Sequence, residues 1–131
     1  MLNRLTLVAL NGAALAAMMI LAGCSQKIEA PFDKGVCYHA VEKDDGKIQY
    51  NKIADNQPNI ENCAARLEEV RQSFLRLGSN RRTIMGAYNG SFIFIEGRVI
   101  KMATHYKGPR ITLLIRTDDG RLVTPGAVAQ P

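Results

Sequence analysis

The sequence has few of the residues from which enzyme active sites are usually built. It contains no tryptophan, three cysteines and two histidines, His39 and His105, which lie far apart in the chain. A glycine-rich phosphate loop, a His-Glu-x-x-His helix, a Gly-x-Ser-x-Gly turn and a Cys-x-x-Cys pair are all missing. These absences exclude the chemistries that such motifs carry. We therefore expect a protein that is not an enzyme and has no small-molecule substrate.

Length and composition limit the architecture to one domain. With 131 residues the chain is too short for a multidomain enzyme, because domains usually contain about 100 to 150 residues. Hydrophobic residues make up 47% of the chain and charged residues 22%. This is enough apolar material for a core and too little charge for a disordered tail, so we expect a compact globular domain.

The first 23 residues have the pattern of an export signal. Arg4 stands in a short polar start, and residues 5–22 carry no charge and end in small side chains. The apolar run is long enough to cross a bilayer, but Asn11 and Gly12 interrupt it. A retained transmembrane helix is the alternative, in which case the cysteine that follows would be incidental.

The tetrapeptide Leu21-Ala22-Gly23-Cys24 resembles a lipobox, the processing site of bacterial lipoproteins. The resemblance implies cleavage before Cys24, a diacylglycerol on its thiol and an acyl chain such as palmitate on the new amino terminus. It divides the chain into a cleaved signal peptide (1–23), a lipidated tether (24–34) and a single globular domain (35–131). Ser25 favours the outer membrane, facing the periplasm, over the inner membrane. Several acyl chains on one residue hold a small protein at a bilayer, since each buried methylene contributes about 0.8 kcal/mol.

Two cysteines remain in the mature chain, Cys37 and Cys63. An even number of thiols in an exported protein predicts a disulfide. The alternative is a zinc site made by Cys37 and His39 with Cys63 and His105. Because exported thiols tend to oxidise and no second closely spaced ligand pair exists, we expect the disulfide, no metal, and no cofactor beyond the lipid on Cys24.

Hydrophobic periodicity predicts an α+β domain with one amphipathic helix on a small antiparallel sheet. Two extended segments, at 36–41 and 47–53, precede a helix at 60–77 that carries Cys63 on its inward stripe. Further extended segments follow at 83–88, 91–95, 99–102, 111–117 and 121–124, and the turns are Asp44-Asp45-Gly46, Asn89-Gly90 and Asp118-Asp119-Gly120. We expect about five to six strands in the order β-β-α-β-β-β, with the disulfide joining the start of the helix to the first strand.

One predicted hairpin is apolar on both faces. Residues 92–95 read Phe-Ile-Phe-Ile, and the neighbouring segment 84–88 is almost as apolar. A single helix covers only one face of a sheet. The other face must be covered by curling of the sheet, by the amino-terminal segment or by another protein. If another protein provides the cover, Phe92, Phe94 and Tyr88 are the candidate partner-binding surface.

The mature chain is modestly basic. Loss of the leader leaves 16 of the 17 basic residues against 12 acidic ones, a net charge of about +4. Lys101, Lys107 and Arg110 form a candidate basic patch, and Arg81 and Arg82 follow the helix. Lipid phosphates or an acidic partner would suit such residues. Nucleic acid is not expected, because the basic stretch contains no binding motif.

These observations favour a small cell-envelope lipoprotein that acts without catalysis, as a protein-binding or structural accessory subunit of an envelope or outer-membrane complex. The membrane, through the lipid anchor, and another envelope protein are its expected partners. The alternative is a small periplasm-facing enzyme or metal-binding sensor that uses His39, His105 and the cysteines. We expect His39 to be partly buried and hydrogen-bonded, and the Asp118-Asp119 pair to form a turn.

Overall fold

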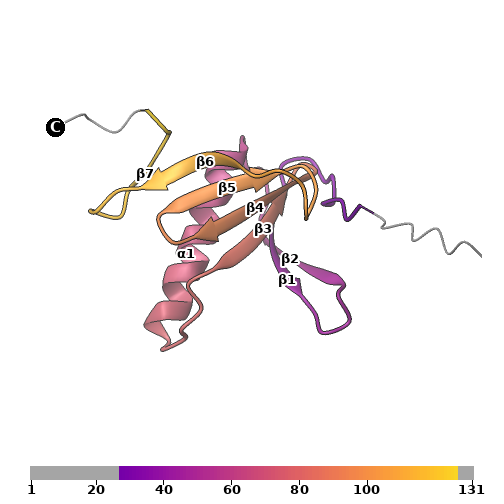
Figure 1. The fold of residues 1–131 in the computed structure, drawn as a ribbon, viewed down its shortest axis with the longest axis horizontal. Helices are drawn as coiled ribbons and strands as arrows, with labels where there is room; N and C mark the ends of the chain where they lie inside the picture. The colour runs from indigo at the N-terminus through magenta and orange to yellow at the C-terminus, as the bar shows by residue number, and fades with distance from the viewer. Residues whose placement is uncertain (1–26, 127–131) are drawn as a thin grey trace, which may run out of the picture.

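Residues 27–126 are described by a computed structural model, in which one helix packs across one face of a seven-stranded antiparallel sheet (Figure 1). The spatial order of the strands is β2-β1-β3-β4-β5-β6-β7, and the helix α1 stands between β2 and β3 in the chain. The elements are β1 (Cys37–Glu42), β2 (Ile48–Ala54), α1 (Ile60–Arg76), β3 (Ile84–Tyr88), β4 (Ser91–Glu96), β5 (Val99–Ala103), β6 (Ile111–Arg116) and β7 (Leu122–Val123).

The predicted α+β class with a single helix is confirmed, but the predicted strand number and order are wrong. We expected about five to six strands in the order β-β-α-β-β-β, whereas seven strands form and five of them follow the helix. Each of the seven extended segments predicted above forms a strand of its own, including the two-residue β7 after the turn at residues 118–120, so the total exceeds the five to six expected. Asn89 and Gly90 both have positive φ, as the predicted type I′ hairpin turn requires.

The helix begins at a polar cap and buries one stripe. The Asn59 side chain accepts a hydrogen bond from the backbone N–H of Asn62 (2.9 Å), which satisfies one of the free donors of the first turn. Cys63, Ala64 and Leu67 recur at helical spacing and are fully buried against the sheet. The main hydrophobic core therefore lies between α1 and the sheet.

Cys37 and Cys63 form the predicted disulfide, with their Cα atoms 5.3 Å apart. The bond joins the start of β1 to the first turn of α1, as expected. Both residues are fully buried among the core side chains. In the chain-entropy model a closed loop of this length contributes roughly 3 to 4 kcal/mol to stability.

The face of the sheet opposite the helix is covered by the chain itself. Two segments provide the cover, residues 28–34, which we call the strap, and the loop 104–110. Ala30 of the strap packs in a cluster with Phe92 and Phe94, and the ring of Tyr106 contacts both phenylalanines. Of the three covers that the apolar hairpin allowed, the amino-terminal segment is the one observed, together with an internal loop.

Backbone hydrogen bonds hold the strap in place. The N–H of Tyr106 donates to the carbonyl of Ile28 and the N–H of Gly90 to the carbonyl of Pro31, both at 3.1 Å. The N–H of Gly35 donates to the side-chain oxygen of Asn89 (2.9 Å). Residues 28–34, which the sequence placed in the tether, therefore pack as part of the folded domain.

A glycine in the middle of β3 allows the helix to approach the sheet. A Cβ atom at Gly86 would overlap Cδ1 of Leu67 and would lie 2.7 Å from the carbonyl oxygen of Tyr38. Leu67 itself is fully buried. Gly86 is thus a position at which α1 packs very closely on the sheet.

Gly86→Ala should lower the free energy of unfolding by about 1–3 kcal/mol, because the added methyl group overlaps Leu67 and a fixed backbone oxygen. Urea denaturation measures this. Addition of Leu67→Ala to Gly86→Ala should cost less than the sum of the two single changes, because the smaller side chain removes part of the overlap. Strict additivity would show that the two positions are not in contact.

A buried ion cluster ties the helix to β6. Both carboxylate oxygens of Glu68 accept hydrogen bonds from Arg71 and Arg116, at 2.5 to 2.9 Å. The Glu68 side chain is only 5% exposed and the two arginine side chains 13%. Burial by itself raises the pKa of Glu68, but the hydrogen bonds from Arg71 and Arg116 together hold it below its usual value.

Glu68→Gln should destabilise the domain by about 3 kcal/mol at neutral pH, because it leaves two largely buried guanidinium groups without a counter-charge. Since the pKa of Glu68 is lowered by folding, its stabilising contribution is present above the usual value of 4.5 and is lost as the pH falls through the lowered value. The stability difference between wild type and variant should therefore shrink in acid. The control is Glu69→Gln, whose side chain is 66% exposed and should cost less than about 1 kcal/mol.

Candidate functional site

Between β1 and β3 the sheet opens into a gap, which we call the β1–β3 split. The two strands pair from Cys37↔Tyr88 as far as Ala40↔Met85. The next residues in register, Val41 and Ile84, are not paired with each other. From there the β1–β2 hairpin turns away from the rest of the sheet (Figure 1). The split forms an open hollow of about 580 Å³. The residues lining it are His39, Ala40, Val41, Glu42, Arg81, Arg82, Thr83, Ile84, Met85, Phe94, Glu96, Tyr106 and Arg110.

The floor of the split is apolar. Ala40, Met85 and Phe94 occupy registered positions on neighbouring strands and so lie on the same face of the sheet. The guanidinium carbon of Arg110 stands 3.7 Å from the centre of the Phe94 ring, in a cation–π contact. Ala40 and Phe94 are both only 3% exposed, so of these three residues the half-buried Met85 is the one open to a bound side chain.

The two acidic residues at the split are already partnered. The hydroxyl of Tyr106 donates to a carboxylate oxygen of Glu42 (2.5 Å), and this hydrogen bond is the main reason why the pKa of Tyr106 is raised. Arg110 donates to Glu96 at 2.5 Å. These contacts neutralise or shield both carboxylates.

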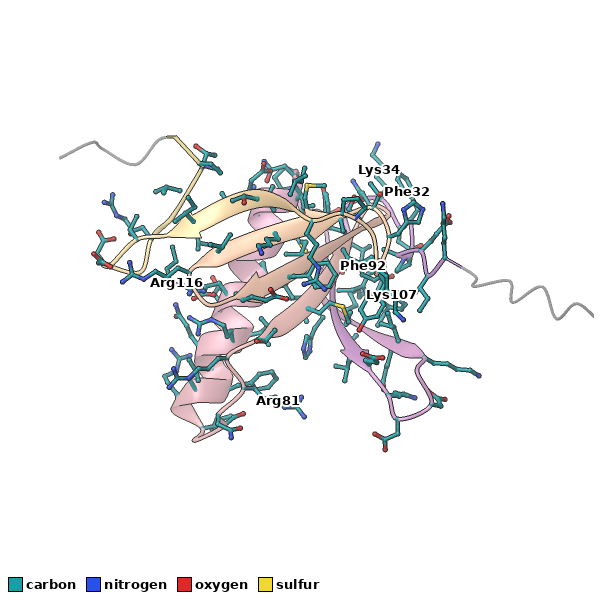
Figure 2. All side chains as sticks on the ribbon, in the orientation of Figure 1. Phe32, Lys34, Arg81, Phe92, Lys107 and Arg116 are labelled. Carbon is teal, nitrogen blue, oxygen red and sulfur yellow. A yellow bond between two sulfur atoms is a disulfide. The ribbon has the colours of Figure 1, made fainter. Side chains whose placement is uncertain are left out.

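Two arginines at the mouth have no such partner. Arg81 and Arg82 follow α1, are exposed, and form no ion pair with any residue between 27 and 126. Figure 2 shows Arg81 at the end of the domain away from Phe32 and Lys34. The split therefore combines an apolar floor with a cationic mouth.

His39 lies at the edge of the split on the helix side. Its ring is half-buried, as expected, and its centre is 5.8 Å from that of Phe74 near the end of α1. The predicted hydrogen bond to His39 is not found among the described residues. Burial, and secondarily the positive charge of Arg81, lower the pKa of His39. Both effects disfavour the protonated imidazole, and the second one links His39 to the charge at the mouth.

The candidate partner-binding surface made of Phe92, Phe94 and Tyr88 is not exposed. Phe92 is 0%, Phe94 3% and Tyr88 6% exposed, because the strap and the loop 104–110 cover the first two. Tyr88 points to the other face, into the helix-side core, and its hydroxyl donates to the carbonyl of Gln57 (2.6 Å). Contrary to expectation, the three residues therefore do not share one docking surface.

The candidate basic patch is divided. Lys107 is exposed and lines a second hollow together with Lys27, whereas Arg110 belongs to the split and is bound to Glu96. Lys101 is half-buried on β5, opposite Phe94 in the register. Only Arg110 of the three therefore contributes to the split.

The remaining predicted residues do not form a second site. Cys37 and Cys63 are joined in the disulfide, so neither thiolate is free for zinc. His39 faces the helix side, whereas His105 bridges to Glu29 beside the strap on the other face. Residues 27–126 hold no group of three metal-ligating side chains. Cys24, with its predicted lipid, lies outside the described residues, and within the described range no helix could cross a membrane.

The contacts across the split were not foreseen from the sequence. Tyr106 and Glu42 are 64 positions apart, and no periodicity connects them. The sequence shows that Arg81 and Arg82 follow the helix. It does not show that they lie beside β1, because this depends on where the pairing between β1 and β3 ends.

No protein-family model, curated protein or solved structure matches this chain. The role of the split must therefore be inferred from its own geometry.

The pKa of His39, followed by NMR titration of its ring protons, should lie below the usual 6.5. Arg81→Gln should raise it part of the way, since removal of the positive charge leaves the effect of burial. Because folding lowers this pKa, the stability that His39 contributes is present above pH 6.5 and is lost as the pH falls through the lowered value. Arg76→Gln is the control, and an equal shift in both variants would contradict a specific effect of Arg81.

Proposed function

We propose that this protein is a lipid-anchored component of the bacterial cell envelope, at the outer membrane and facing the periplasm, that binds another envelope protein without catalysing a reaction. Three features support the proposal. They are the lipobox-like sequence ending at Cys24, the disulfide between Cys37 and Cys63, which suits an oxidising compartment, and the open β1–β3 split.

The observation that carries the binding role is the end of strand pairing at Ala40↔Met85. Beyond this pair, Val41 and Glu42 of β1 are paired on one side only, with β2, and Ile84 of β3 is paired on one side only, with β4. Such edges bind extended peptide segments through main-chain hydrogen bonds. The split is therefore a position where a segment of another protein can complete the sheet.

The charge at the split indicates what kind of segment would bind. Arg81 and Arg82 are exposed and without ion pairs in the described part of the chain, whereas Glu42 and Glu96 are engaged by Tyr106 and Arg110. An acidic segment with an apolar residue for the floor is complementary to this arrangement. Because these residues offer no nucleophile paired with a base, the geometry favours binding over hydrolysis.

A photo-crosslinking residue placed at Thr83 in cells tests this proposal. Thr83 is exposed and lines the split, so we expect a crosslinked species that contains a second envelope protein. Arg81→Ser with Arg82→Ser should reduce this species roughly tenfold, because the charge complementarity is lost. Two matched controls apply: the crosslinker at the exposed Thr124, and the equal charge change Arg66→Ser with Arg76→Ser on the helix.

Crosslinks of equal yield from positions 83 and 124 would contradict a specific role for the split. A loss of crosslinking in the helix control as large as in the Arg81 and Arg82 variant would show a non-specific effect of net charge.

A further inference from the structure

We infer that one end of the domain rests on the surface of an anionic bilayer, with Phe32 inserted among the lipid headgroups and Lys27, Lys34 and Lys107 against their phosphates. This membrane end is the end of the sheet at which the strap enters. The inference goes beyond the protein-binding role and rests on the proposed function only in taking Cys24 to be the lipidated residue.

Chain length brings this end close to the anchor. The strap is fixed to the domain from Ile28 onward, through the hydrogen bond from Tyr106 to the Ile28 carbonyl. Ile28 is four positions after Cys24, and a fully extended chain of that length spans at most about 14 Å. Lys27 is only three positions after Cys24, so its charge can lie within about one Debye length, roughly 8 Å, of the headgroups when its side chain extends toward them.

The sheet topology gathers exposed apolar side chains at the same end. Phe32 lies against Gly90 in the β3–β4 turn and is 74% exposed. Ile111, at the start of β6, is 61% exposed. Since Phe92 pairs with Ala103, the β3–β4 turn and the β5–β6 loop lie at one end of the sheet. Exposed aromatic and aliphatic side chains beside a lipid anchor are the residues that enter the interfacial region of a bilayer.

Lysines surround these apolar residues. Lys27 and Lys107 line one hollow, and Figure 2 shows Lys34 beside Phe32, with Lys107 on the same side of the domain. All three lysines are exposed. A lysine close to an anionic leaflet contributes about 1 kcal/mol of attraction.

Two acidic residues of the strap lie in the same region, and each has a partner. Glu29 stands 3.8 Å from His105, and Asp33 accepts a hydrogen bond from the Tyr38 hydroxyl (2.6 Å). Lys27, Lys34 and Lys107 outnumber the two strap carboxylates by one. Asp55, paired with Lys52 at 3.3 Å, and Glu61 of the first turn of α1 lie at the same end of the sheet. Arg81, at the mouth of the split, lies at the other end of the domain from Phe32 and Lys34 (Figure 2). The same orientation on the bilayer would therefore leave the split open to the periplasm.

The absence of tryptophan makes a direct test feasible. The full chain carrying Phe32→Trp is purified with its lipid and reconstituted in vesicles of phosphatidylcholine with about 30% phosphatidylglycerol, an anionic surface of the kind that attracts lysines. Leu77→Trp is the control, since Leu77 is 84% exposed just after α1. Brominated lipids should quench the F32W fluorescence at least about twofold more than the L77W fluorescence, because only the interfacial residue meets the acyl chains.

Lys27→Gln, Lys34→Gln and Lys107→Gln together should reduce the quenching of the F32W protein in the anionic vesicles, because the attraction to lipid phosphates is removed. Equal quenching of the F32W and L77W proteins would overturn the inference. The inference would also be overturned if the three lysine changes did not reduce the quenching of the F32W protein. The mass of the purified protein reports on the anchor separately. A chain that begins at Met1 with no lipid would refute the proposed function and the anchor that the inference takes from it, whereas the quenching of the F32W protein tests the membrane contact itself.

Discussion

The structure depends on a strand that is apolar on both faces. Phe92 and Phe94 of β4 point to one side of the sheet, and Ile93 and Ile95 to the other, and all four are almost completely buried. The helix can cover only the isoleucine side, where Leu67 packs over Gly86. The phenylalanine side takes its cover from the strap and the loop 104–110. The need to bury these two rings thus places the amino-terminal segment on the sheet and brings Tyr106 across to β1.

Two different links fix the helix on its side of the sheet. The disulfide from Cys63 to Cys37 holds its first turn to β1, and Glu68 holds its middle to Arg116 of β6. The last turn has neither link, and it lies near the mouth of the split, where Phe74 touches His39. The disulfide thus lies at the strap end of the sheet, whereas Arg116 lies at the other end, beside the β4–β5 turn.

Local features of the sequence predicted the elements well and the long-range arrangement poorly. The spacing around Cys63 and Leu67 predicted the helix and its buried stripe, and Asn89-Gly90 predicted the hairpin. The double-sided apolar strand showed that both faces need cover, but nothing in its residues distinguishes a strap from a partner protein. The split was invisible in the sequence, because the end of pairing between β1 and β3 depends on contacts such as Tyr106 with Glu42.

The strap also determines how mechanical force would enter this domain. A pull on the amino-terminal end reaches the fold first at Ile28, whose carbonyl accepts a hydrogen bond from Tyr106, and next at Pro31, bound by Gly90. Tension would therefore strip the strap from the aromatic side of the sheet before it reached the disulfide at Cys37. Pulling the strap away from the sheet would uncover Phe92, whereas the helix-side core would stay closed.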